Sequence, residues 1–338
     1  MLKKIRSTFI LKKIFNHIDN KRKFQSIVHN KKLQQKLRLN LIDFRRVSGR
    51  YIEEEYDKTI EYNSYNHRKI FEGHYSNGKR NGEGKEYNED GNLIFKGEFL
   101  DGKRWTGHGK EYDEDTENLI FEYELLNGKI TGEGKEYDKI NGDLLFSGNY
   151  LNGKRNGKGE EYKYIPLERS NDYYSYSSNN HSKQIIIFSG EYLDGERKKG
   201  KEYNYEEKLI YDGEYKNGKR HGFGKIYSNR WNENILKYEG GFLNGKKHGR
   251  GIEYENGNLK YEGEYLNGKK NGKGKEYIKD YFNFQLIFEG KYFKNYRYKG
   301  KEYYKNGKLK FEGEYLFAKK WNGKEYDYNG NEVFEINN

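Results

Sequence analysis

From residue 71 onward, short segments of alternating aromatic and polar residues are separated by Asn-Gly or related turns. Tyr261, Gly263 and Tyr265 fall on one face of an extended strand, and the intervening glutamates fall on the other. Asn267-Gly268 follows directly, and this dipeptide between alternating segments is a strong signal for a β-hairpin. The pattern therefore predicts a hairpin in which the aromatic residues share one face.

The same pattern begins ten times, at steps of 23 to 27 residues except for one longer step, which is typical of a repeat architecture. The first aromatic residues of the units are Phe71, Phe95, Phe121, Phe146, Phe188, Tyr211, Tyr238, Tyr261, Phe288 and Phe311. We predict a mainly β fold, an elongated single-layer antiparallel sheet of about ten consecutive hairpins. Symmetric pairing about the first turn would place Phe71 opposite Tyr87.

The chain divides into four predicted regions by pattern. Residues 1–50 form a basic helical segment, and residues 51–70 form a linker or a degenerate first hairpin. The repeat array covers residues 71–326, with an irregular polar insert at 163–187 that contains the only proline, Pro166. Residues 327–338 form a terminal strand or tail.

The spacing aromatic-x-Gly-x-aromatic-x-x-Gly-x-x-x-Gly-x-Gly-x-x-Tyr resembles the MORN repeat. The first unit shows it with Phe71, Gly73, Tyr75, Gly78, Gly82, Gly84 and Tyr87. The resemblance covers about three quarters of the chain. It implies a membrane-associated or cytoskeletal scaffold with phosphoinositide contact.

Residues 1–50 show a helical period, in which Ile10, Ile14 and Ile18 share one face. Asn30 is a candidate N-cap for a further helix that carries Leu33. The segment resembles an F-box-like module without its usual Leu-Pro start, which implies a Skp-type adaptor as partner. A lipid-facing helix and an N-terminal cap on the sheet are the two alternatives.

The net charge of +12 is concentrated at one end of the chain. Residues 1–50 contain fifteen Lys and Arg against two acidic residues, a net +13, which leaves a net charge of −1 for the rest. The repeats are therefore poor candidates for specific nucleic-acid binding, whereas the first segment could bind anionic lipid. The candidate lipid-binding residues are Lys3, Lys4, Arg6, Lys12, Lys13, Lys21, Arg22 and Lys23.

The chain shows no residue pattern typical of an active site. Residue types that often act in catalysis are either absent or repeated in many units, whereas a catalytic group is expected to occur once. The chain has no Cys, which excludes thiolate chemistry and disulfides. Its glycines do not follow the Gly-x-Gly-x-x-Gly order of a nucleotide loop, and the glutamate of Lys-Glu-Tyr recurs in seven units. We expect no enzyme activity, no cofactor and no metal, and no apolar stretch is long enough to span a membrane.

A contiguous aromatic face is the candidate protein-binding surface, with mutual stacking of the rings as its alternative role. The second aromatic residues of the units carry this prediction, namely Tyr75, Phe99, Tyr150, Tyr192, Tyr215, Phe242, Tyr265, Tyr292 and Tyr315. We therefore expect a non-enzymatic, intracellular, cytoplasmic scaffold that binds a partner protein on this face and a second partner through residues 1–50. Association with the membrane or cytoskeleton fits the MORN resemblance. The alternative is a peripheral membrane protein that binds anionic lipid through residues 1–50.

Overall fold

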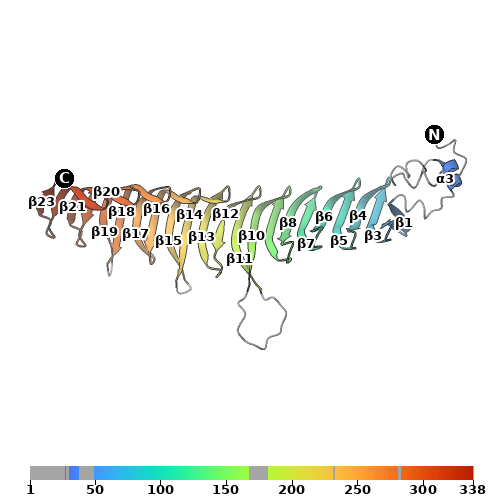
Figure 1. Cartoon of the computed structure of the whole chain (residues 1–338), viewed down its shortest axis with the longest axis horizontal. Coiled ribbons are helices and arrows are strands. Elements are labelled where there is room, and N and C mark those ends of the chain that lie inside the picture. The colour runs from blue at the N-terminus through green and yellow to red at the C-terminus, as the bar shows by residue number, and fades with distance from the viewer. Residues whose placement is uncertain are drawn as a thin grey trace, which may run out of the picture. The chain divides into compact units, whose positions relative to one another are not determined.

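The computed structural model describes residues 27, 30–37, 49–166, 182–230, 233–280 and 283–337. The chain divides into two compact units, Met1–Gly134 with Lys139–Gly142, and Lys135–Asp138 with Asp143–Asn338. All 23 strands of the described chain belong to one open antiparallel sheet, which confirms the predicted fold class (Figure 1).

The first unit consists of consecutive hairpins, each strand pairing with the next in sequence (Figure 1). Its strands are β1 (Arg50–Glu55), β2 (Lys58–Asn63), β3 (Lys69–Ser76), β4 (Lys79–Tyr87), β5 (Leu93–Leu100), β6 (Lys103–Tyr112) and β7 (Leu119–Leu126). The next strand, β8 (Lys129–Tyr137), contributes residues to both units.

The second unit repeats the same order of antiparallel neighbours from β9 to β23. Its strands are β9 (Leu144–Leu151), β10 (Lys154–Pro166), β11 (Ser182–Leu193), β12 (Glu196–Tyr203), β13 (Leu209–Lys216), β14 (Lys219–Arg230), β15 (Glu233–Leu243), β16 (Lys246–Glu255), β17 (Asn258–Leu266), β18 (Lys269–Lys279), β19 (Phe284–Phe293), β20 (Tyr296–Tyr303), β21 (Leu309–Leu316), β22 (Lys319–Tyr326) and β23 (Glu332–Ile336).

The Asn-Gly dipeptides form tight turns as predicted. Asn267 and Gly268 both have positive φ, at 51° and 86°, as a two-residue hairpin turn requires. The predicted pairing of Phe71 with Tyr87 is wrong, because Phe71 lies opposite Glu86. The register shifts between Gly73 and Tyr75, where the opposite strand carries two extra residues, as in an extended β-bulge.

The core consists of rings laid over pairs of glycines. In nine of the ten units the first aromatic side chain is at most 1% exposed. The Phe288 ring covers Gly290 and Gly300, and a Cβ atom built on either glycine would lie 2.8 Å from the Phe288 Cζ atom. In the third unit Tyr123 takes this place, and its ring covers Gly109. The glycines thus leave room for a buried ring in a sheet that has only one layer.

The described part of the N-terminal segment contains one helix, α3 (Lys31–Leu37). The predicted cap is confirmed, because Asn30 Oδ1 accepts a hydrogen bond from the Leu33 backbone N–H at 3.1 Å. Leu33 and Leu37 are buried, as the predicted apolar face requires. Most of residues 1–50, and with them the F-box-like resemblance, lie outside the described residues.

Candidate functional site

The ring ladder predicted to bind a protein is buried rather than exposed. Tyr75 is half-buried, and the other eight rings are at most 7% exposed. Each ring packs edge-on against the first aromatic ring of its own unit, and most also pack against a neighbouring unit, as Tyr292 does with Phe288 at 5.4 Å and Tyr261 at 5.2 Å. The premise of an exposed aromatic face is therefore wrong, because stacking between units covers the rings. A role of these rings in partner contact stays a prediction.

Ion pairs cover the ring ladder and join successive hairpins. The Arg197 guanidinium lies over the Phe188 ring at 4.2 Å and pairs with Glu161. Tyr192 also donates a hydrogen bond to Glu161, at 2.8 Å. Burial alone raises the pKa of the Glu161 carboxyl, but the hydrogen bond and the positive charge of Arg197 outweigh it, so that the net pKa is lowered. Glu161 takes the place that the glutamate of Lys-Glu-Tyr has in other units, where Glu136, Glu202 and Glu276 likewise pair with an arginine. These glutamates are therefore partly buried structural groups on the ring face.

The shifted pKa values of the buried glutamates and tyrosines predict that the protein loses stability at both low and high pH. Glutamates with a lowered pKa stabilise the fold above their ordinary pKa of 4.5, and this contribution is lost as the pH falls through the lowered value. Burial, followed by the hydrogen bond to Glu61, raises the pKa of Tyr75 to about 12, so its contribution is lost between pH 10 and 12. We expect a plateau in the thermal unfolding midpoint with a decline on each side.

The acid decline can be assigned to the buried glutamates with a matched pair of variants. Glu161→Gln should flatten the fall of the melting temperature between pH 5 and 3, because the side chain that titrates is gone. Glu83→Gln removes an exposed glutamate and should leave the fall unchanged. Equal slopes for the two variants would contradict this role for Glu161.

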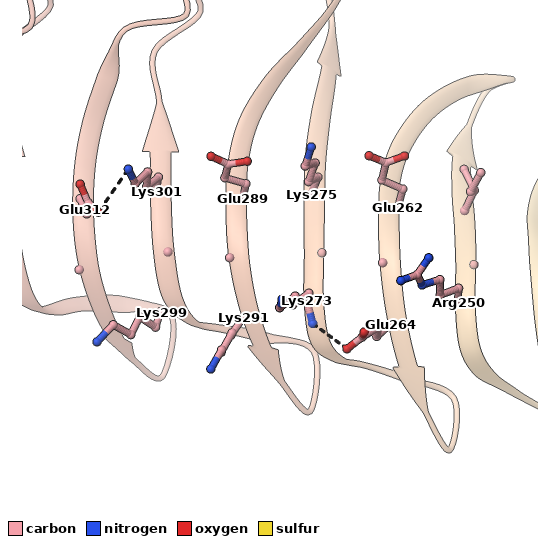
Figure 2. Close-up of a pocket in the computed structure, with 17 residues that line it drawn as sticks. Arg250, Glu262, Glu264, Lys273, Lys275, Glu289, Lys291, Lys299, Lys301 and Glu312 are labelled. Atoms are coloured by element: carbon pink, nitrogen blue, oxygen red, sulfur yellow. Dashed lines mark hydrogen bonds and ion pairs between the residues drawn. The ribbon is translucent and has the colours of Figure 1, made fainter.

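A groove with a volume of about 830 Å³ lies on the face opposite the rings, across β16 to β21 (Figure 2). Its floor is a line of glycines on six adjacent strands, which face one another in register. These are Gly251, Gly263, Gly274, Gly290, Gly300 and Gly313. Because side chains alternate along a strand, the residues on either side of each glycine point away from the ring and form the walls.

One wall of the groove, which we call the alternating row, carries charges of opposite sign on successive strands. Its members are Glu262, Lys275, Glu289, Lys301 and Glu312, each in register with the next. Lys301 and Glu312 form an ion pair at 3.4 Å. The Glu262 and Glu289 carboxylates accept hydrogen bonds from Tyr277 and Tyr303. With three glutamates and two lysines, this wall has a net charge of −1.

The other wall holds three lysines on successive strands, which we call the basic row: Lys273, Lys291 and Lys299 (Figure 2). Lys291 lies in register with Lys273 on one side and with Lys299 on the other. Lys299 forms an exposed ion pair with Glu314 at 3.1 Å. Sequence reasoning missed this row, although a comparison of the ten units at the position of Lys291 reveals it.

The groove offers charged walls and a bare backbone floor. Within the described ranges, no group of three His, Asp or Glu side chains could hold a metal ion. No helix of the described chain is both long and apolar enough to cross a bilayer. The eight basic residues predicted to bind lipid lie outside the described part. What the groove can do chemically is bind an elongated charged ligand.

The hairpins, the stacked rings and the glycine floor define a single-layer β-hairpin repeat protein. Five segments of the array are MORN repeats, because the MORN repeat model matches residues 71–93, 146–163, 211–232, 238–259 and 261–281. The last two matches overlap the groove. Residues 238–259 include Gly251 of its floor, and residues 261–281 include Gly263 and Gly274.

Other comparisons add little. No curated protein matches this chain. Among solved structures it is similar to the one titled "Crystal Structure of TarM", with 16% identity and a TM-score of 0.19. That match covers 40% of this chain and 27% of the other, so this chain spans about a quarter of that protein.

Proposed function

We propose that the protein is a non-enzymatic scaffold that binds a partner protein along the glycine-floored groove. The observation that supports it best is the groove itself, about 830 Å³, which is lined by glycines, charged side chains and Ile252. Six strands contribute to it, so an elongated ligand can contact several repeats at once. The proposal keeps the predicted scaffold role and moves the contact surface from the ring face to the opposite face.

The groove can be tested by site-specific photocrosslinking, because the chain contains no cysteine. A Lys301→Cys variant labelled with benzophenone maleimide places the probe on the alternating row. Asp90→Cys places it on an exposed loop of the first unit and serves as the control. In an extract of the cells that make the protein, we expect discrete protein adducts from the groove position only. Adducts that are identical at both positions, or present at neither, would refute the proposal.

Residues 1–50 are part of the same proposal as a second contact, with a Skp-type adaptor as one candidate partner. The concentrated charge of +13 favours a specific alternative, binding to anionic lipid. Each basic residue near an anionic surface contributes about 1 kcal/mol. Replacing the eight predicted lipid-binding residues with Gln should therefore abolish sedimentation with vesicles of phosphatidylcholine and phosphatidylserine. Wild-type binding that is insensitive to salt would argue against this electrostatic mechanism.

A further inference from the structure

The basic row breaks a charge pattern that the rest of the array keeps. Lys291 follows the first glycine of the ninth unit, and six of the ten units have Glu at this position. These are Glu98, Glu124, Glu191, Glu214, Glu264 and Glu314. Lys291 is the single Lys or Arg among the ten, and the first unit has His74 there. The ninth unit has therefore reversed the charge at one position of the wall.

The reversal has no compensating contact. Like charges directly opposite on neighbouring strands are destabilising, and Lys291 faces a lysine on both sides. Lys273 and Lys291 are exposed, and among the described residues neither side chain forms an ion pair. The Glu264 carboxylate, which lies near Lys273, accepts a hydrogen bond from the Lys273 backbone N–H at 2.9 Å. Three lysines thus lie side by side on this wall, and the repulsion between their charges destabilises the pairing of β18, β19 and β20.

The fifth unit shows that hairpin geometry does not require this lysine. There Lys158, Glu191 and Lys199 occupy the same three registers on β10, β11 and β12. Both hairpins have the register shift at the same place, after Glu191 and after Lys291. The two rows differ at their centre alone, where one has Glu and the other has Lys. Sheet geometry therefore leaves the charge at this position free to serve recognition.

We propose that the basic row binds an acidic segment of a partner protein, a run of Asp or Glu in extended conformation. This inference rests on the proposed function and names the chemistry of its ligand. Strands are about 4.8 Å apart, so the three lysines span roughly 10 Å, which three to four extended residues cover. An acidic run fits the row because it supplies carboxylates to the Lys273 and Lys291 ammonium groups, which form no ion pair among the described residues, and Lys299 can exchange its exposed pair with Glu314 for the ligand.

The shape and charge of the groove favour a single chain over a membrane surface. The alternating row places Glu262, Glu289 and Glu312 on the opposite wall (Figure 2). A flat layer of anionic headgroups would meet these carboxylates together with the lysines. A single extended chain that follows the basic row avoids them.

The test uses the full chain and a labelled peptide of ten glutamates as the probe. Zero-length carbodiimide coupling joins a bound carboxylate to a nearby lysine, and mass spectrometry maps the site separately from residues 1–50. In the wild type we expect coupling at Lys273, Lys291 and Lys299. Lys291→Glu should lower coupling at Lys273 and Lys299 about tenfold, because attraction at the centre becomes repulsion.

The fifth unit allows the site to be moved. Adding Glu191→Lys to the Lys291→Glu variant should produce new coupling at Lys158 and Lys199, which is weak in the wild type. Lys291→Glu places a negative charge between Lys273 and Lys299, so the melting temperature of this variant should not fall below that of the wild type. If it does fall, Lys291→Gln, which removes the positive charge without adding a negative one, replaces it in the coupling experiment.

Three results would overturn the inference. Coupling at Lys273 and Lys299 that is unchanged in both Lys291 variants would show that the row does not act as a site. If Glu191→Lys created no coupling at Lys158 and Lys199, three lysines in register on neighbouring strands would not be enough to form the binding site. Protection of the basic row by phosphatidylserine vesicles, without coupling of the peptide, would assign it to lipid. Groove adducts from Lys301→Cys would leave the proposed function intact in each case.

Discussion

Phe288→Ala is expected to lower the free energy of unfolding by about 3–5 kcal/mol. The Phe288 side chain is 0% exposed and lies over Gly290 and Gly300. It packs edge-on against Tyr292 and Tyr315, with ring centroids 5.4 and 5.7 Å apart. A single-layer sheet has no second layer that could move in to fill the space. The loss can be measured by urea unfolding followed by circular dichroism.

Phe293→Ala is the matched control, because Phe293 lies on the same strand and its side chain is 57% exposed. Its removal should change the free energy of unfolding by less than about 0.5 kcal/mol. In a repeat array each hairpin depends on its neighbours, so Phe288→Ala should also increase hydrogen exchange in β19 to β22. A loss below about 1 kcal/mol, or equal losses for both variants, would contradict the assignment of Phe288 to the core.

Gly290→Ala is expected to lower the free energy of unfolding by about 1–3 kcal/mol through crowding. A Cβ atom at this position would lie 2.3 Å from the Lys299 carbonyl oxygen and 2.7 Å from the Gly300 Cα atom. Both are backbone atoms of the partner strand, so relief requires the strands to separate. The same urea experiment measures the effect.

Gly307→Asn provides the comparison for crowding. Gly307 lies in a turn with a φ of 81°, and no atom is within 4 Å of a Cβ built there. Asn tolerates this backbone conformation, so the variant should remain close to the wild type in stability. If Gly290→Ala were equally stable, the close approach of the strands at the glycine floor would be refuted.

The fold was predictable because its signals are local and repeat. Asn267-Gly268 marks a turn without reference to anything distant, and ten copies of the pattern remove the ambiguity of any single one. The register was harder, because the shift near Gly73 depends on how two strands bend around the Phe71 ring. Alternation in the sequence records which residues share a face, but it does not record a bulge.

The candidate site was harder to predict for a different reason. The sequence shows that Tyr265 and Tyr292 share a face, and it does not show that each ring packs against the first ring of the neighbouring unit. Burial of these rings depends on contacts between units, which composition cannot reveal. The groove on the other face is formed by residues that look like ordinary solvated charges, and Lys291 differs only when the ten units are compared position by position.

The separation of the ring face from the groove face has a consequence for how such a protein can evolve. Rings, glycines and the ion pairs over them hold the sheet together, whereas the groove walls contribute little to that packing. At equivalent positions the fifth unit has Glu191 and the ninth has Lys291. An exchange of this kind can therefore alter ligand preference in one repeat without any change in the core packing. Duplication of a hairpin supplies another wall position on the same scaffold, so an ancestral array could gain or lose specificity one unit at a time.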